Sequence, residues 1–180
     1  DNAVTFRTVV DTAAARNGLW ADFGPKPLAD RPGNGLHINF SVTAADGRDV
    51  LPAAIAGILA RISDMTLFLN PKEESYRRFG SCKAPRYISW SAENRSQLIR
   101  VPAAEGEYRR AELRSPDALC NPYLAFALLI RAGMEGIARE AQLPPAVDLN
   151  LFTVPEEVRR RYALLPETLA AAKAAAAGSD

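Results

Sequence analysis

Arg95-Ser-Gln-Leu-Ile-Arg-Val-Pro102 and Glu107-Tyr-Arg-Arg-Ala-Glu-Leu-Arg114 carry charged side chains on two segments whose alternation is typical of β-strands. Residues two apart share a face of an extended chain, so Arg110, Glu112 and Arg114 are expected to project together. A carboxylate between two guanidinium groups stays ionised. Such a face suits a divalent cation on the carboxylate, and carboxylate or phosphate groups on the arginines.

Other segments with strand-like patterns lie around this stretch. Between residues 36 and 43, the apolar residues alternate with His37, Asn39, Ser41 and Thr43. Segments 86–92, 96–101 and 108–114 follow with short connections, which favour antiparallel neighbours. We therefore predict an α+β fold: an antiparallel sheet with one polar active-site face and helices packed on the other. A further short strand is predicted at 19–23.

Helical spacing of apolar residues predicts helices at 5–17, 51–69 and 123–140, the last capped by Asn121 and Pro122. Its larger apolar residues are expected to pack on the sheet: Leu124, Leu128, Ile130, Met134 and Ile137. Thr153 and Glu156 have the spacing of a capping box before a short helix. Segment 72–83 is charged and is expected to be an exposed, mobile loop. The alanine-rich end predicts a helix at 167–177, with fraying over 161–180.

Composition favours one domain over residues 1–180, because 48% of the 180 residues are hydrophobic. A net charge of +1 gives no drive toward nucleic acid or an anionic membrane, and no signal-peptide pattern opens the chain. Two isolated cysteines, Cys82 and Cys120, fit a reducing cytoplasm. Eight of the 18 arginines fall between Arg77 and Arg114, which indicates a shared anion site.

The sequence has no phosphate loop of the Gly-Lys-Ser/Thr type, no paired zinc-ligand spacing and no Gly-x-Ser-x-Gly elbow. The only histidine, His37, is equally well explained as a structural residue and as a ligand. Together with Glu112 and Arg100, it makes half of a site for metal-assisted handling of phosphate.

Several separate motifs together resemble glutamine synthetase, in order and spacing, from about Phe6 to Phe152. They are Gly33-Asn34-Gly35-Leu36-His37, Ser89-Trp90-Ser91, Asn94-Arg95-Ser96, Ile99-Arg100-Val101-Pro102, Glu112-Leu113-Arg114-Ser115-Pro116-Asp117 and Asn121-Pro122-Tyr123-Leu124-Ala125. The resemblance covers the C-terminal half of that family's catalytic domain. The remaining carboxylate metal ligands are therefore expected upstream of residue 1.

The resemblance implies a reaction in which ATP phosphorylates the side chain of glutamate and ammonia displaces the phosphate, with two Mg²⁺ or Mn²⁺ ions. It places His37 and Glu112 as metal ligands, Gly33, Arg78 and Arg114 at the amino-acid substrate, and Arg95 between substrate and phosphate. Arg78 and Arg95 are the implied catalytic residues. The implied ATP-binding residues are Asn39, Ser41, Arg95, Arg100 and Arg110. Members of the family form ring homo-oligomers.

The sequence departs from the family pattern at three positions. Cys82-Lys83 stands where a flap Glu is usual, Pro32 where an Asn is usual, and Phe152 where some bacterial members carry an adenylylated Tyr. A cation at Lys83 repels ammonium, which leaves open a γ-glutamyl ligase that uses an organic amine. A non-catalytic assembly or regulatory protein is a third alternative. The 180-residue chain alone is expected to be inactive and to bind magnesium weakly.

Overall fold

The computed structural model of the chain describes residues 2–80, 83–104, 106 and 109–179. Cys82, Glu105 and Tyr108, which belong to the predicted flap, connection and strand, lie outside the described residues. The elements in chain order are α1 (Asn2–Arg16), β1 (Ile38–Phe40), α2 (Leu51–Leu69), a 3₁₀ helix η1 (Glu73–Arg78), β2 (Trp90–Ser91), β3 (Ile99–Arg100), β4 (Ala111–Leu113), α3 (Pro122–Ala138), α4 (Glu156–Arg159) and α5 (Leu169–Ala177).

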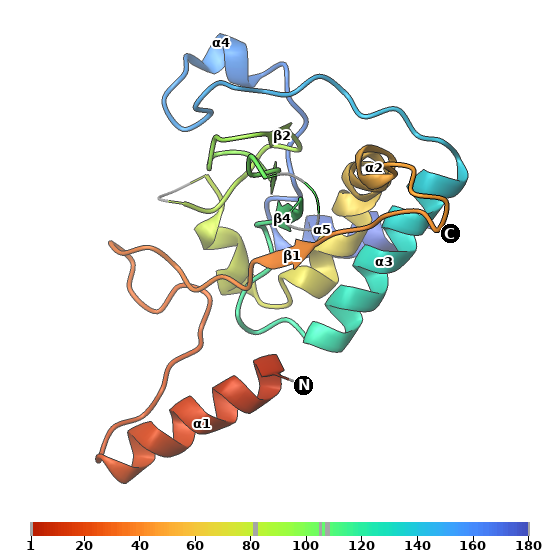
Figure 1. Cartoon of the computed structure of the whole chain (residues 1–180). Helices are drawn as coiled ribbons and strands as arrows, with labels where there is room; N and C mark the ends of the chain where they lie inside the picture. The colour runs from red at the N-terminus through yellow and green to blue at the C-terminus, as the bar shows by residue number, and fades with distance from the viewer. Residues whose placement is uncertain (1, 81–82, 105, 107–108, 180) are drawn as a thin grey trace.

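The four strands form one sheet in the order β1-β4-β3-β2 (Figure 1). β4 is antiparallel to both of its neighbours, as predicted, but β2 runs parallel to β3. The intervening turn does not close a hairpin, because Ser91 Oγ accepts hydrogen bonds from the backbone of Glu93 and Asn94. Asn94 Oδ1 then accepts from Ser96 N, at 2.9 Å, and the chain re-enters the sheet in its original direction.

One face of the sheet is apolar and packs on helices, as the alternation predicted. Ile38, Ile99 and Leu113 are buried in one core cluster with α2 residues such as Ile55 and Ile62. The register pairs Ile38 with Leu113 on the apolar face and Asn39 with Glu112 on the polar face. Each face is therefore continuous across the two strands. The α+β class with a polar face opposite the helices is confirmed.

Helix α2 has the bounds that the sequence predicts and forms the centre of the core. Asp49 Oδ1 accepts a hydrogen bond from Leu51 N at the helix start, 3.2 Å away, and the helix stops at Asn70. Its 19 residues, with a mean hydropathy of 1.4, satisfy the length and composition of a membrane span. More than half of this segment is buried against other parts of the described chain, and core packing explains its apolar composition.

Helix α3 lies side by side with α2 (Figure 1). It turns small residues toward α2, since Gly136 faces Gly57. The Asn121 cap is confirmed, because its Oδ1 accepts from Tyr123 N and Leu124 N. The predicted burial is confirmed in part for Leu128, which packs against the core, but it was wrong for Ile130 and Met134, which are 65% and 55% exposed. The buried residues are Pro122, Ala125, Leu129, Ala132, Gly133 and Gly136. The reason is the close helix crossing, where Gly57 meets Gly136 and no larger side chain fits.

Segment 72–83 differs from the exposed loop that its charge predicted. It contains η1, in which Ser75, Tyr76 and Arg78 are buried. Ser75 Oγ accepts a hydrogen bond from Lys72 N at 3.1 Å, and the Tyr76 ring meets Phe79 edge-on. The segment therefore presents Arg78 from a packed element.

The segment around 144–151 is held against the sheet by a side chain that the strand pattern did not single out. Gln97 is fully buried, and its Nε2 donates to the carbonyl oxygens of Val147 and Leu149 at 2.8 and 2.7 Å. Its Oε1 accepts from Ser89 Oγ. Every polar atom of this buried amide group therefore has a partner, which is the condition for burying it at little cost.

The terminal helices pack to different extents. In Figure 1, α1 stands apart from the other elements, and none of its described residues is buried. Residues 19–23 form no strand. The capping box at α4 was wrong, because Thr153 Oγ1 donates to Asn150 O and the N-cap is Pro155. Helix α5 contacts α2 and buries Ala172.

Cys120, two residues before the start of α3, is fully buried. Burial is the main cause that raises the pKa of its thiol to about 11, and the charge of Asp117 acts in the same direction. The thiolate fraction at pH 8 is then about one in a thousand. We expect a Cys82→Ser variant to resist iodoacetamide at pH 8 when folded and to react within minutes in concentrated urea, as followed by mass spectrometry. Rapid labelling of the folded variant would contradict this burial.

Candidate functional site

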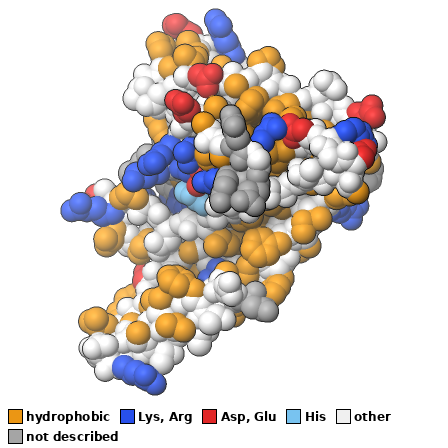
Figure 2. Space-filling view, in the orientation of Figure 1, with side chains coloured by type: hydrophobic (Ala, Val, Ile, Leu, Met, Phe, Trp, Pro, Cys, Tyr) orange, Lys and Arg blue, Asp and Glu red, His pale blue; other side chains and the backbone are white. Residues whose placement is uncertain are grey.

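Strands β1 and β4 bring His37 and Glu112 together. The pairs Ile38–Leu113 and Asn39–Glu112 fix the register, so His37, one residue before β1, comes beside the polar face of β4. His37 Nδ1 lies 2.9 Å from Glu112 Oε1. In Figure 2 the pale blue histidine lies beside blue Lys and Arg side chains.

Glu112 is held between two guanidinium groups, as predicted, although one of them differs from the prediction. Arg114 Nη1 lies 3.1 Å from Glu112 Oε1, and Arg100 Nη1 lies 3.4 Å from Oε2. The sequence placed Arg110 in the second position. β3 instead supplies Arg100, because the register of β3 and β4 sets Arg100 opposite Glu112. Arg110 is exposed, farther along the same strand edge.

The electrostatics keep Glu112 ionised. Burial alone would raise the pKa of Glu112, but Arg114 and His37, through charge and hydrogen bonds, lower it by more, and the net pKa lies below its usual range. The Glu112 side chain is 12% exposed and that of Arg114 is 4% exposed. Solvent therefore screens this pair weakly, and the carboxylate remains charged at neutral pH.

His37 is neutral at pH 7. Burial is the largest cause that lowers its pKa, and the charge of Arg114 adds to it, while Glu112 opposes it. A neutral imidazole is the form that binds a metal ion. In the structure, Nδ1 of His37 donates a hydrogen bond to the ionised Oε1 of Glu112 at 2.9 Å. A divalent cation held by both side chains would take the place of this hydrogen bond.

Arg78 reaches the same site from η1. Its Nη1 donates to Asn70 Oδ1 at 3.3 Å and to Ser115 O at 3.1 Å. Burial is the main cause that lowers the pKa of Arg78, and the charge of Asp117 opposes that shift. An arginine stays protonated under such a shift. A fixed cation is thus buried at the site, with its guanidinium bound to neutral carbonyl oxygens.

A small cavity of about 40 Å³ joins these groups, lined by Pro32, Gly33, Gly35, His37, Arg78, Lys83 and Ala84. Gly33 is required here, because a Cβ would lie 2.3 Å from Pro25 O and 2.8 Å from Arg78 Cγ. Arg114 Nη2 also donates to Lys83 O, at 3.4 Å. The Gly33 loop, the flap residue Lys83 and the β1–β4 pair therefore meet at one place.

The structure brings most, but not all, of the predicted site residues together. His37, Glu112, Arg78, Arg100, Arg114 and Gly33 surround the contacts above. Asn39 lies opposite Glu112 in the sheet, so it shares this face. Ser41 also borders a separate cavity between β1, α2 and α3. Arg95 is exposed in the connection between β2 and β3.

Two residues around Arg78 were assigned no role by the sequence. Asn70, the C-cap residue of α2, is fully buried, and its Oδ1 accepts a hydrogen bond from Arg78. Asp117, also fully buried, lies close enough to raise the pKa of Arg78 by its charge. Asp117 follows Arg114 in the quoted Arg-Ser-Pro-Asp motif, which was the available signal. Asn70 gave no comparable signal, because Asn before Pro is common at helix ends.

Comparison with a sequence model of a protein family and comparison with individual relatives give the same family. The sequence model described as "Glutamine synthetase, catalytic domain" matches residues 1–180. Glutamine synthetase of Methanosarcina mazei is 43% identical over 173 residues, which cover 88% of this chain and 38% of the relative. That of Clostridium saccharobutylicum is 40% identical, covering 94% of this chain and 42% of the relative.

Solved structures agree with the sequence relatives. A GmaS complex with ADP has a TM-score of 0.86 at 29% identity, covering 99% of this chain and 44% of that one. GmaS without ligand has a TM-score of 0.84 at 31% identity, with coverage of 97% and 42%. The chain thus spans about two fifths of the length of its relatives.

Proposed function

The chain belongs to the glutamine synthetase catalytic-domain family, and from this premise we propose that it is part of an ATP-dependent ligase that joins ammonia to glutamate. The proposed reaction transfers the γ-phosphoryl group of ATP to the side-chain carboxylate of glutamate. Ammonia then attacks the acyl carbon, and phosphate leaves. The complete activity belongs to a longer protein, since this chain spans about two fifths of its relatives.

The observation that carries the proposal is the charge balance around Glu112. Arg78, Arg100 and Arg114 converge on a site with two carboxylates, Glu112 and the buried Asp117, and Lys83 lines the same cavity, so four cations face two anions among the described residues. This surplus of positive charge favours anionic substrates, and glutamate and ATP both carry the planar or tetrahedral anions that guanidinium groups bind well.

We assign the individual roles from the family resemblance and the positions above. Arg78, Arg114 and Gly33 hold glutamate, and Arg95 acts between glutamate and the transferred phosphate. The nucleotide residues are Asn39, Ser41, Arg95, Arg100 and Arg110. The similar GmaS structure is a complex with ADP, which supports an adenine nucleotide as a ligand of the complete protein.

His37 and Glu112 would hold Mg²⁺ or Mn²⁺, an ion whose chemistry here is to neutralise charge on phosphate and carboxylate oxygens. His37 supplies a neutral nitrogen, and Glu112 an ionised oxygen at 2.9 Å from it. Arg100 and Arg114 orient the carboxylate of Glu112 by binding both of its oxygens. We also propose a cytoplasmic ring homo-oligomer for the complete protein, without nucleic-acid or membrane partners.

A second candidate acceptor is an organic amine, which Lys83 favours. Lys83 is exposed at the cavity that His37 and Arg78 line, where a cation repels ammonium. An organic amine that is neutral at the working pH approaches such a site without this electrostatic penalty. The non-catalytic alternative is weaker, because assembly alone does not require His37 and Glu112 on one polar face.

A comparison of acceptors tests the proposed reaction. We expect the complete protein to release phosphate from ATP with glutamate and either ammonium or 2,2,2-trifluoroethylamine, an organic amine that is neutral at pH 7.5, and the 180-residue chain to release none. A Lys83→Glu variant is expected to raise kcat/KM for ammonium relative to this neutral amine by about ten-fold, because it reverses the charge that repels ammonium. Coupled phosphate assays measure both rates.

Lys173→Glu is the matched control, because Lys173 is exposed on α5 and does not line this cavity. It should leave the acceptor ratio unchanged. Complete protein that releases no phosphate with glutamate and either acceptor would overturn the ligase proposal. An unchanged ratio in Lys83→Glu would overturn only the role of Lys83.

A further inference from the structure

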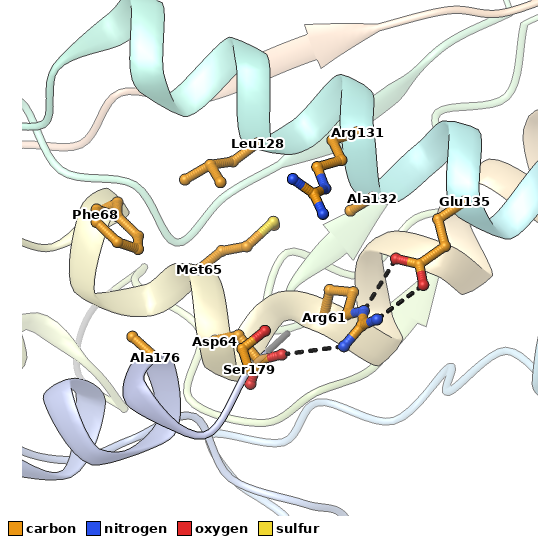
Figure 3. Close-up of a pocket in the computed structure, with 10 residues that line it drawn as sticks. All are labelled: Arg61, Asp64, Met65, Phe68, Leu128, Arg131, Ala132, Glu135, Ala176 and Ser179. Carbon is orange, nitrogen blue, oxygen red and sulfur yellow. Dashed lines mark hydrogen bonds and ion pairs between the residues drawn. The ribbon is translucent and has the colours of Figure 1, made fainter.

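A second cavity, away from the candidate site, lies between α2, α3 and the end of α5. Its volume is about 170 Å³, and Figure 3 shows the side chains around it. α2 contributes Arg61, Asp64, Met65 and Phe68, which form one stripe of the helix. A cavity of about 150 Å³ is large enough for a benzene-sized molecule. This space therefore accommodates a small organic ligand.

The two ends of the cavity differ in chemistry. Met65 and Phe68 of α2 and Leu128 of α3 form an apolar end (Figure 3). At the other end are Arg61 and Glu135, with Asp64 beside them. The cavity is thus amphipathic along its length, which suits a ligand with an apolar body and a charged head.

Most of the charges at the polar end already bind one another. Arg61 Nε and Nη2 donate to both carboxylate oxygens of Glu135, at 3.0 and 2.8 Å. Arg139 Nη2 approaches the same carboxylate to 2.6 Å, and Arg61 Nη1 lies 3.7 Å from Asp64. The carboxylate oxygens of Glu135 therefore already bind two arginine side chains, which leaves little hydrogen-bonding capacity for a ligand.

Arg131 is the exception. In Figure 3 its guanidinium group points into the space above Met65, between the apolar and the charged ends. Within the described chain, the structure shows no hydrogen bond or ion pair from Arg131 to another residue, although its charge lies near enough to lower the pKa of Glu135. Arg61, in contrast, is held in place by two hydrogen bonds to Glu135. A guanidinium group beside an apolar wall binds a carboxylate through two parallel hydrogen bonds.

We propose that this cavity binds a small monocarboxylate with an apolar chain, of the size of a branched-chain amino acid or its 2-oxo acid. The carboxylate binds Arg131, and the chain packs on Met65, Phe68 and Leu128. Asp64 lies where it would favour an ammonium group on the ligand. None of the residues of the proposed ligase centre lines this cavity. Ligand binding to the cavity can therefore be measured directly, without an activity assay.

Isothermal titration of the 180-residue chain with leucine, 4-methyl-2-oxopentanoate and leucinamide tests the proposal. We expect saturable binding of at least one acid, and binding of leucinamide at least about ten-fold weaker, because it lacks the carboxylate. Arg131→Gln should weaken binding of the acid by about ten-fold or more. Arg131 is exposed, so this substitution leaves the fold intact, which circular dichroism verifies.

Arg16→Gln is the matched control, because it removes the same charge from an exposed arginine of α1 that does not line the cavity. It should leave the affinity unchanged. Tighter binding of leucine than of the oxo acid assigns the ligand to amino acids, and the reverse assigns it to oxo acids. The proposal fails if neither acid saturates, if leucinamide binds as tightly as the acids, or if both arginine variants weaken binding equally.

Discussion

Glu112→Gln is expected to lower kcat/KM of the complete protein for ATP-dependent amide formation by at least about a hundred-fold. The substitution keeps the shape of the side chain but removes the charge that, in the proposed metal site, would bind a divalent cation beside His37. It also removes the carboxylate that Arg100 and Arg114 orient. Phosphate release at increasing Mg²⁺ concentration measures the loss, which excess metal should restore only in part.

The same substitution is expected to destabilise the folded chain by about 3 kcal/mol, because Arg114 becomes a buried cation without its carboxylate partner. Arg114 and His37 outweigh burial and lower the pKa of Glu112 in the folded state, so the unfolded chain binds the extra proton first as the pH falls. The stabilisation by Glu112 is thus present at neutral pH and is lost on acidification. Urea unfolding at several pH values should show the difference from wild type shrinking toward low pH.

Glu157→Gln serves as the control, because Glu157 is an exposed carboxylate in α4. We expect it to change neither activity nor stability measurably. Wild-type activity in Glu112→Gln, with an unchanged Mg²⁺ dependence, would remove Glu112 from the proposed metal site.

Gly136→Ala is expected to lower the stability of the chain by at least about 2 kcal/mol, or about 4–8 °C in Tm. A Cβ at Gly136 would lie 2.2 Å from Ala53 O and 2.7 Å from the Cα of Gly57. Both neighbours are backbone atoms of α2, so α2 and α3 must move apart and lose packing along their contact. This cost exceeds the gain of about 1 kcal/mol from replacing Gly by Ala in a helix.

Gly133→Ala, on the same helix one turn earlier, is the matched control. Its Cβ would meet Ala54 Cβ at 3.6 Å and Ile58 Cδ1 at 3.8 Å, which are ordinary contacts. We expect this variant to be as stable as wild type or more stable by up to about 1 kcal/mol. Equal Tm values for the two alanine variants in thermal unfolding would contradict the close crossing of α2 and α3.

The candidate site was predictable where it depends on strand alternation and motifs. His37 and Glu112 lie on polar positions of alternating segments, and the sheet register brings them within 2.9 Å. Arg100 was recognised as a site residue, but its pairing with Glu112 depends on which strand lies beside β4. Asn70 precedes Pro71 at the end of α2, and its contact with Arg78 follows from the packing of η1. Contacts between distant segments are set by the whole fold, and local patterns do not encode them individually.

The sequence by itself determined the bounds of α2, the Asn121 cap of α3 and the polar face of the sheet, because hydrogen bonds and side-chain spacing within a few residues decide these features. Only the tertiary structure decided that β2 is parallel to β3 and that α3 buries its glycines rather than Ile130 and Met134. A helix with apolar residues on several faces has more than one face to bury. The close approach of Gly57 and Gly136 selects the small face, since two glycines permit a shorter distance between helix backbones than any pair of larger side chains.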